Sequence, residues 1–295
     1  MSTFYMIVGI AGSGKSTLYE EQYAHAGMVY VSSDAIREEV FGDANDQTHN
    51  AKVFEIMKQR TLQALCGHKD VFYDATNLSA KRRIAFLKNL EGIENLRKVC
   101  VVNVVPVHVA WERNSSRERK VPLEVINRMA KQFETPHESE GWDEIIVHNE
   151  FYQPFVLHDV IVSLCSELHE NPHHSLTIGN HMVAAGTSLV NVGAPDYLIL
   201  AGFYHDCGKG FCKTFTNMKG EVTPIAHYYS HENVGAYLYL TYCYKDYVDL
   251  YIANLIQHHM DFFKGEKYLQ KIADRFGEEF MRDLTLLHEA DINAH

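Results

Sequence analysis

Hydrophobic residues in the first half of the chain form short apolar runs separated by longer segments with helical spacing. The short runs are rich in β-branched and aromatic residues, which is typical of buried strands. They cover residues 4–10, 28–31, 71–73 and 99–105. Between them, segments such as 52–65 and 81–90 repeat apolar residues every three or four positions. This alternation predicts a parallel sheet covered by helices.

From about residue 151 onward the strand-like runs disappear, and apolar residues recur only at helical spacing. The expected helices cover 156–168, 181–192, 197–205, 231–243, 249–259 and 276–291. Asn149 and Pro154 interrupt the pattern between the two halves. We therefore expect an α/β domain over residues 1–150 and an all-α helical bundle over residues 151–295.

The composition is that of a folded globular protein. The 295 residues are 46% hydrophobic and 22% charged, which excludes a disordered chain. No apolar run approaches the roughly 18 residues that a membrane helix requires, and the chain begins without a basic leader. Six scattered cysteines with no Cys-x-x-Cys pair indicate buried thiols in a reducing compartment. We expect a soluble cytoplasmic protein with no membrane partner.

Charge and histidine divide unevenly between the halves. The net charge is −11, and residues 151–295 hold 17 acidic against 9 basic residues together with 12 of the 18 histidines. Such an acidic chain is poorly suited to coating duplex nucleic acid non-specifically. An excess of histidine and carboxylate in one half is the composition that a metal site would produce.

A glycine-rich loop follows the first expected strand and matches the pattern G-x-x-x-x-G-K-[ST] from Gly9 to Ser16. Its backbone N–H groups would surround phosphate oxygens, Lys15 would contact the β and γ phosphates of ATP, and Ser16 would bind Mg²⁺. The residues expected to bind the cofactor are Gly12, Ser13, Gly14, Lys15, Ser16 and Thr17.

Charged residues follow the later strands, where open α/β sheets place their sites. Asp34 could accept a proton from an acceptor hydroxyl and Arg37 could hold an acceptor phosphate, although Ser33 or Asp34 could equally cap a helix. Asp74 ends the third strand, where it could assist Mg²⁺ or orient the acceptor. Arg113 and Arg117 share one helical face and could neutralise a transferred phosphoryl group, or belong to a solvated helix.

These four elements, in this order, resemble the kinase domain of polynucleotide 5′-kinases over about residues 4–134. The resemblance implies that Lys15 and Ser16 hold ATP and Mg²⁺, with Asp34 as the general base. It makes Arg37 an acceptor contact, and it makes Arg113 and Arg117 lid arginines on the phosphates. Thr76 and Asn77 match a family Thr-Asn-Leu stretch that binds substrate. The family has Asp directly before this stretch, whereas here Ala75 intervenes and Asp74 lies one residue earlier.

The second half carries a series of histidines and aspartates about one helical hairpin apart. The series comprises His181, His205, Asp206, His231, His258, His259 and Asp291. Each helix of a bundle could contribute one ligand to a shared interior site. Imidazole mixed with carboxylate suits one or two ions of Mn²⁺, Fe²⁺, Co²⁺, Ni²⁺ or Zn²⁺.

The series resembles the HD phosphohydrolase superfamily over about residues 155–295. The resemblance implies that His181, the His205-Asp206 pair and Asp291 hold one metal, and that His231 and His258 hold a second with Asp206. His259 is then expected to support the ligands from behind. Lys209 is expected to contact a substrate phosphate, and His174 could line the site or start a helix.

The leading hypothesis is an enzyme that heals nucleic-acid ends, with RNA favoured over DNA. It would phosphorylate 5′-OH ends with ATP and remove 2′,3′-cyclic, 2′- or 3′-phosphates, preparing ends for a separate RNA ligase. One alternative is a nucleoside or small-metabolite kinase fused to a nucleotidase, which the acidic net charge favours. A second alternative is a non-catalytic nucleotide sensor.

Overall fold

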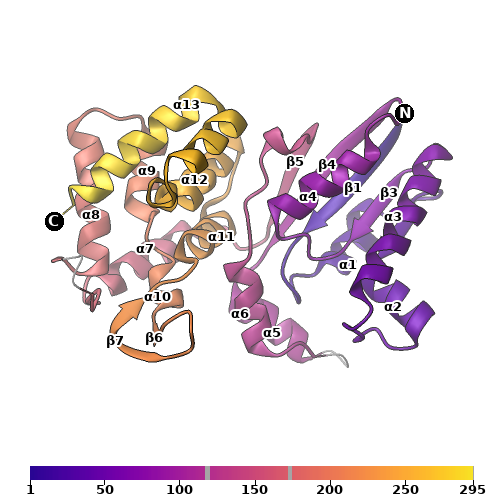
Figure 1. The fold of residues 1–295 in the computed structure, drawn as a ribbon, viewed down its shortest axis with the longest axis horizontal. Helices are drawn as coiled ribbons and strands as arrows, with labels where there is room; N and C mark the ends of the chain where they lie inside the picture. Colours follow the sequence, from indigo (N-terminus) through magenta and orange to yellow (C-terminus); the bar gives the residue numbers. More distant parts are fainter. Residues whose placement is uncertain (117–119, 172–174, 295) are drawn as a thin grey trace. The chain divides into compact units, whose positions relative to one another are not determined.

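The computed structural model describes residues 1–116, 120–171 and 175–294, which form two compact units. The sheet unit comprises Met1–Met129 and Pro136–Glu150, and the helical unit comprises Ala130–Thr135 and Phe151–His295. Figure 1 shows a strand sheet with flanking helices in the first unit, and helices with a short strand pair in the second. An α/β domain followed by a helical domain is therefore confirmed.

The sheet unit is built on five parallel strands in the order β2-β3-β1-β4-β5. Its strands are β1 (Ser2–Val8), β2 (Val29–Ser32), β3 (Val71–Asp74), β4 (Leu96–Val104) and β5 (Glu144–Asn149). Its helices are α1 (Lys15–Leu18), η1 (Tyr19–Tyr23), α2 (Ser33–Phe41), α3 (Asn50–Cys66), α4 (Ala80–Leu87), η2 (Lys88–Leu90), α5 (Val107–Ser115), α6 (Leu123–Lys131) and η3 (Glu138–Glu140). The sequence prediction lacks β5.

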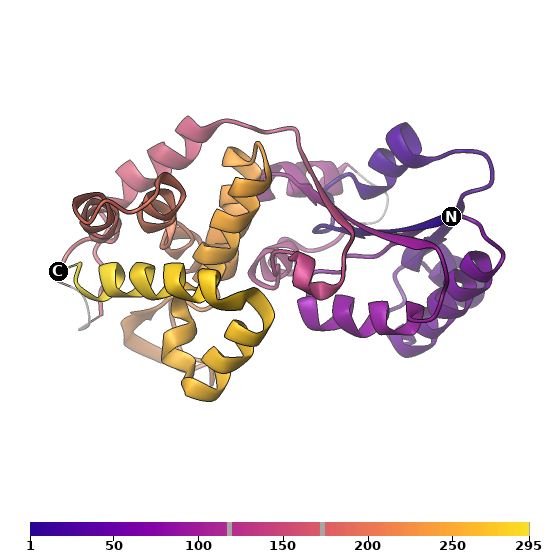
Figure 2. The ribbon, with the colours of Figure 1, turned by 90° about the horizontal axis from the view of Figure 1, so that it is seen from above.

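Both faces of this sheet are covered, as in other parallel sheets. On one face Leu18 of α1 packs with Ile7 and Phe72 in a buried apolar cluster. On the other face Phe86 of α4 lies 5.5 Å from Phe4, ring centre to ring centre. Figure 2 shows α1 and α4 on opposite sides of the strands. Because β3, β1 and β4 are parallel neighbours, their carboxyl ends lie side by side at the same end of the sheet.

The helical unit is a bundle with one short antiparallel strand pair. Its helices are α7 (Pro154–Leu164), α8 (Ile178–Asn191), α9 (Asp196–Tyr204), α10 (Lys209–Cys212), α11 (His231–Cys243), α12 (Tyr247–His258), η4 (His259–Lys264) and α13 (Glu266–Ile292). The strands β6 (Thr214–Thr216) and β7 (Val222–His227) form a hairpin that the sequence prediction lacks (Figure 1). In the described ranges no helix combines the length and apolarity needed to cross a bilayer.

A short segment from the first half of the chain, Ala130–Thr135, belongs to the helical unit. Phe133 is fully buried and its ring centre lies 5.1 Å from that of Tyr237 in α11. The backbone N–H of Thr135 donates to the side-chain oxygen of Gln257 in α12 at 2.6 Å. The helical unit therefore includes six residues that precede Pro136–Glu150 of the sheet unit.

Candidate functional site

The glycine-rich loop connects the end of β1 to α1. Gly12 and Gly14 have φ angles of 81° and 90°, which side chains rarely adopt. A Cβ atom on Gly12 would lie 2.1 Å from the carbonyl oxygen of Ala110, so only glycine fits there. Lys15 bends back over the loop, and its ammonium donates to the carbonyl of Ile10 at 2.9 Å. This tight turn is the geometry that leaves loop amides available to phosphate oxygens.

The hydroxyl of Ser16 faces the carboxylate of Asp74, which is buried at the end of β3. Ser16 Oγ donates to Asp74 Oδ2 at 3.3 Å, and the hydroxyl of Tyr30 donates to the same oxygen. Burial raises the pKa of Asp74, while the nearby Lys15 charge acts in the opposite direction. A hydroxyl beside a carboxylate is an oxygen donor set that fits Mg²⁺. The one-residue shift around Ala75 still leaves Asp74 beside Ser16.

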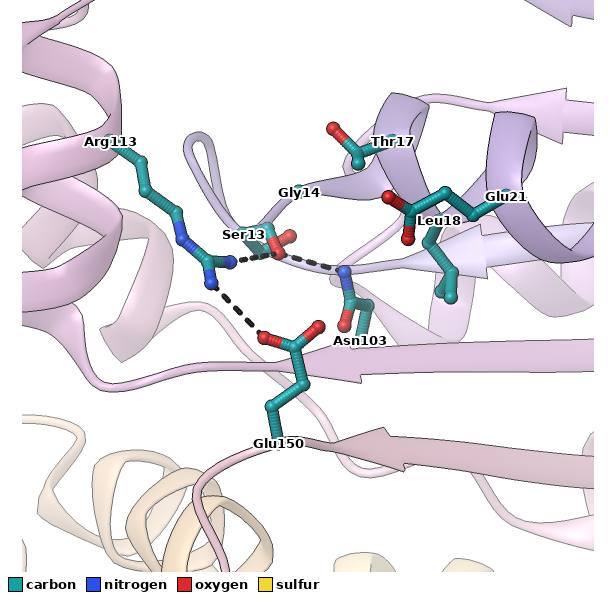
Figure 3. Close-up of a pocket in the computed structure, with 8 residues that line it drawn as sticks. All are labelled: Ser13, Gly14, Thr17, Leu18, Glu21, Asn103, Arg113 and Glu150. Atoms are coloured by element: carbon teal, nitrogen blue, oxygen red, sulfur yellow. Dashed lines mark hydrogen bonds and ion pairs between the residues drawn. The ribbon is translucent and has the colours of Figure 1, made fainter.

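Next to the loop lies a pocket of about 380 Å³ (Figure 3). Arg113 points into it from α5 and contacts Glu150 at 3.1 Å and the carbonyl of Ser13 at 3.4 Å. Asn103, at the end of β4, donates to the same carbonyl at 2.8 Å. Thr17 and Glu21 also line the pocket. The sequence prediction includes Ser13, Gly14, Thr17 and Arg113 but lacks the other four lining residues, which are Leu18, Glu21, Asn103 and Glu150.

Asp34 and Arg37 lie at the start of α2, directly after β2. Arg37 is only 5% exposed, and its guanidinium donates to Asp34 Oδ1 at 3.0 Å and to Asn50 Oδ1 at 2.7 Å. The capping residue is Ser32, whose hydroxyl accepts from the N–H of Ala35 at 3.4 Å. Asp34 therefore does not cap the helix, and its side chain is 57% exposed while it pairs with Arg37.

Thr76 and Asn77 support the loop in this structure. The carbonyl of Thr76 accepts from the N–H of Gly9 at 3.1 Å. The side-chain amide of Asn77 donates to the carbonyls of Ile7 at 2.7 Å and Ala75 at 3.3 Å. The amide nitrogen of Asn77 is thus engaged within the protein, and its role as a substrate contact stays a prediction. Arg117 lies outside the described residues.

In the helical unit, the helices α8, α9, α11, α12 and α13, with the turns after α9 and α12, bring histidines and aspartates together in the buried interior. Nε2 of His181 lies 2.8 Å from Asp291 Oδ1 and 3.3 Å from Nε2 of His205. Nε2 of His205 lies 3.4 Å from Asp206 Oδ2. His181, His205 and Asp206 offer ligand atoms within 4.8 Å of one another. Together with Asp291 they could hold one cation.

A second group shares Asp206. Nε2 of His231 lies 3.0 Å from Asp206 Oδ1, and Nε2 of His259 lies 3.6 Å from the same oxygen. The two Nε2 atoms are 3.2 Å apart. These three residues form another set of ligand atoms within 4.8 Å of one another. Asp206 could therefore bridge two cations.

Backbone carbonyls fix the orientation of all four imidazoles. Each Nδ1 atom lies within hydrogen-bond distance of a carbonyl oxygen, which can only accept, so Nδ1 carries a hydrogen. The pairs are His181 with Ala294 at 2.9 Å, His205 with Gly202 at 2.8 Å, His231 with Tyr228 at 2.8 Å and His259 with Ile256 at 2.6 Å. In the neutral ring Nε2 then carries the lone pair that a metal ligand donates.

The Asp206 carboxylate is the strongest indication of a cation. Asp206 is 1% exposed, and its two buried oxygens face only nitrogen groups, among them the Lys209 ammonium at 2.6 Å and Nε2 of His231 at 3.0 Å in the described part of the chain. Burial lowers the pKa of His205, but the charges of Asp206 and Asp291 outweigh it and raise the value to about 10. The cluster thus attracts a proton when no cation is present. These residues fit one or two divalent cations.

His258 and His259 exchange their expected roles. His258 Nδ1 contacts Asp261 Oδ2 at 2.6 Å, and its ring centre lies 4.7 Å from that of Phe276. His258 therefore faces away from the ligand cluster, and the expectation that it binds metal is wrong in this structure. His259 occupies that place because α12 ends at His258 and the chain turns into η4.

Lys209 lies inside the cluster. Its ammonium is 2.6 Å from Asp206 Oδ2 and 3.3 Å from Nε2 of His169, so it faces a carboxylate and an imidazole. Burial and the Lys209 charge lower the pKa of His169 to about 4, which keeps that ring neutral. The sequence prediction lacks His169, since a lone histidine in an irregular segment gives no pattern. His174 lies outside the described residues.

The fold and the two sites define a P-loop domain of the kinase type and a helical domain with a His-Asp cluster that could hold metal ions. Residues 4–136 match the family described as AAA domain, and residues 173–291 match the HD domain family. The first half of the chain is therefore similar to a P-loop domain and the second half to an HD domain, and each match covers less than half of the chain. The two resemblances are confirmed at the level of these domains.

Comparisons beyond the two families give distant neighbours. No curated protein matches the chain. A structure of the Pnkp1/Rnl/Hen1 RNA repair complex is 22% identical with a TM-score of 0.39, over 44% of this chain and 43% of that one. A gluconokinase from Sinorhizobium meliloti is 18% identical with a TM-score of 0.35, over 49% of this chain and 81% of that one. The chain spans less than half the length of the first of these.

Proposed function

We propose that this chain is a bifunctional enzyme that repairs nucleic-acid ends, with RNA as the favoured substrate. The sheet unit transfers the γ-phosphate of ATP to a 5′-OH end, and the helical unit removes a 2′,3′-cyclic, 2′- or 3′-phosphate. The observation that carries the proposal is the union in one chain of an acceptor-side pair, Asp34 and Arg37, with a cluster of buried metal-ligand residues around Asp206. The pair would serve the phosphorylation of the 5′-OH end, and the cluster would serve the removal of the terminal phosphate.

In the sheet unit, the loop from Gly12 to Thr17 cradles the ATP phosphates, and Lys15 contacts them. Ser16 and Asp74 would hold Mg²⁺, which would neutralise charge on the phosphates. Asp34 accepts the proton of the attacking 5′-OH, because its carboxylate is exposed at the carboxyl edge of the sheet. Arg37 holds an acceptor phosphate.

Positive charge near the transferred group comes from the lid of the same unit. Arg113 already reaches the loop through the Ser13 carbonyl, and Arg117 follows it four residues later in the sequence. Both neutralise charge on the moving phosphoryl group.

In the helical unit, His181, His205, Asp206 and Asp291 would hold one cation, and Asp206, His231 and His259 a second. Divalent Mn²⁺, Fe²⁺, Co²⁺, Ni²⁺ or Zn²⁺ would supply Lewis-acid activation of a phosphate ester. The carbonyls behind each imidazole keep the nitrogen ligands in place. Lys209 contacts the phosphate of the substrate.

The products of the two reactions suggest where the enzyme acts. A 5′-phosphate and a free 3′-OH are the ends that a ligase joins, so we place a separate RNA ligase downstream. Within the described residues all six cysteines are free thiols, which supports a cytoplasmic location.

A second candidate is a small-molecule kinase fused to a nucleotidase. The net charge of −11 favours it, because extended strands usually bind in basic grooves. A nucleotide sensor is the third candidate, and the proton-accepting Asp34 argues against it because binding alone needs no base.

The test is direct. The protein is incubated with γ-labelled ATP, Mg²⁺ and a 5′-OH RNA oligonucleotide, and separately with a 2′,3′-cyclic-phosphate RNA and Mn²⁺, Co²⁺ or Ni²⁺. We expect both reactions. Lys15→Ala and Asp34→Ala should abolish labelling and keep hydrolysis, and Asp206→Ala should do the reverse. Labelling of a free nucleoside but not of RNA, or hydrolysis of nucleotides alone, would overturn the proposal in favour of the small-molecule enzyme.

A further inference from the structure

Tyr30 lies beside Asp74 because of the register between two neighbouring strands. β2 and β3 are parallel, with Tyr30 opposite Phe72 and Ser32 opposite Asp74. Side chains two positions apart in a strand share a face, so Tyr30 and Asp74 lie diagonally on the same side of the sheet. Tyr30 donates its hydroxyl hydrogen to Asp74 Oδ2.

The ring of Tyr30 is held by packing. It stacks on Tyr19 of η1 with ring centres 4.2 Å apart and planes inclined by 17°, and the ring centre of Phe72 lies 6.3 Å away. Burial and the Asp74 charge raise the pKa of Tyr30, so the phenol keeps its hydrogen and acts as a donor. The position of this donor is therefore set by the sheet and by η1, independently of any ligand.

Asp74 needs such a donor. Its side chain is 6% exposed, and a buried carboxylate loses free energy unless donors or a cation compensate for its lost hydration. Ser16 is the other hydroxyl at the same oxygen, 3.3 Å away, but it is exposed and would itself bind the cation. Tyr30 is the donor whose place does not depend on the nucleotide.

We propose that Tyr30 is a positioning residue for the cation site of the sheet unit: its hydroxyl fixes the Asp74 carboxylate in the orientation that receives the divalent cation of the nucleotide. This inference rests on the proposed phosphotransferase function of that unit. Tyr30 itself does not touch the nucleotide or the reacting atoms. Its hydroxyl increases the affinity with which the nucleotide-bound protein binds the cation.

The test compares two single-oxygen deletions on the same face of the sheet. Tyr30→Phe keeps the ring and its stacking and removes only the hydroxyl. Tyr23→Phe is the matched control, because Tyr23 also packs against Phe72 and its hydroxyl contacts His148 at 2.7 Å instead of Asp74. Near-ultraviolet circular dichroism verifies that both variants keep their packing.

Cation binding is measured directly. Mn²⁺ is titrated into full-length protein saturated with a non-hydrolysable ATP analogue, and free Mn²⁺ is followed by electron paramagnetic resonance. Asp206→Ala is present in every sample to remove ions bound by the helical unit. We expect Tyr30→Phe to weaken Mn²⁺ binding roughly tenfold or more, the usual effect of losing a hydrogen bond to a charged group. Metal-free binding of the analogue should not change, and Tyr23→Phe should behave as the parent.

Equal Mn²⁺ affinity in Tyr30→Phe and its parent would overturn the inference, as would equal weakening in both phenylalanine variants, which would indicate a packing effect. If the parent binds Mn²⁺ with the analogue and labels RNA while Tyr30→Phe is unaffected, only the role of Tyr30 fails. If the parent binds neither analogue nor Mn²⁺, the proposed function of the sheet unit fails and the inference fails with it.

Discussion

Replacing Arg83 with methionine should strongly destabilise the sheet unit. Arg83 is 1% exposed, and its guanidinium donates twice to Glu140, each time at 2.7 Å. It also donates to the carbonyls of Asn77 at 3.0 Å and Leu78 at 2.9 Å. Without Arg83, Glu140 keeps the indole N–H of Trp142 at 3.0 Å but loses its counter-charge. Breaking such a buried pair from one side costs about 3–5 kcal/mol.

The matched control is an exposed ion pair in the same unit. Arg97 contacts Glu144 at 2.5 Å, and both side chains are more than 40% exposed. Because water and salt screen this pair, Arg97→Met should cost less than about 1 kcal/mol. The double variant Arg83→Met with Glu140→Met should recover much of the loss, because no charge is then left buried alone.

The assay uses the positions of the tryptophans. The chain has two, Trp111 and Trp142, and both belong to the sheet unit. Urea unfolding followed by tryptophan fluorescence therefore reports on that unit, whatever happens in the helical unit. An Arg83→Met midpoint no lower than that of Arg97→Met would refute the reasoning, and so would a double variant less stable than Arg83→Met.

Three further predictions concern single side chains. His259→Ala should lose one bound cation by elemental analysis while His258→Ala keeps both, and the opposite result would restore His258 as the ligand. Gly208→Ala should also lose metal, because its Cβ would lie 2.1 Å from the carbonyl oxygen of His231; full metal content would contradict this. Burial lowers the pKa of His148 below its usual 6.5, so the stability of the sheet unit that is present above pH 6.5 should decrease as the pH falls. In His148→Gln, the urea unfolding midpoint should depend less on pH between pH 7.5 and about 5. An unchanged pH dependence would contradict this prediction.

The phosphate-binding loop could be predicted from the sequence because its parts are contiguous. Gly12 and Gly14 occupy positions that need a positive φ, and Lys15 and Ser16 follow directly. The aspartate at the end of β3 was also predictable, since the end of an apolar strand fixes its location. The contact between Asp74 and Ser16 depends on strand order, which the sequence does not state.

Two features could not be predicted from local pattern. β5 is an edge strand of intermediate burial, and its short apolar run at 145–147 lies between Glu144 and His148. His258 and His259 are adjacent, and helical spacing places them about 100° apart around the axis. Which of them meets Asp206 depends on where α12 ends, and helix ends are the least certain feature of any sequence pattern.

The six residues Ala130–Thr135 have a consequence for dissecting this protein. A gene split after residue 150 would put Phe133 into the wrong fragment, and the partner ring of Tyr237 would then face a hole. Gln257 would lose its hydrogen bond from the Thr135 amide, and Gln257 lies two residues before His259. When the halves are expressed separately, we expect the second half to fold correctly only if it also carries this hexapeptide.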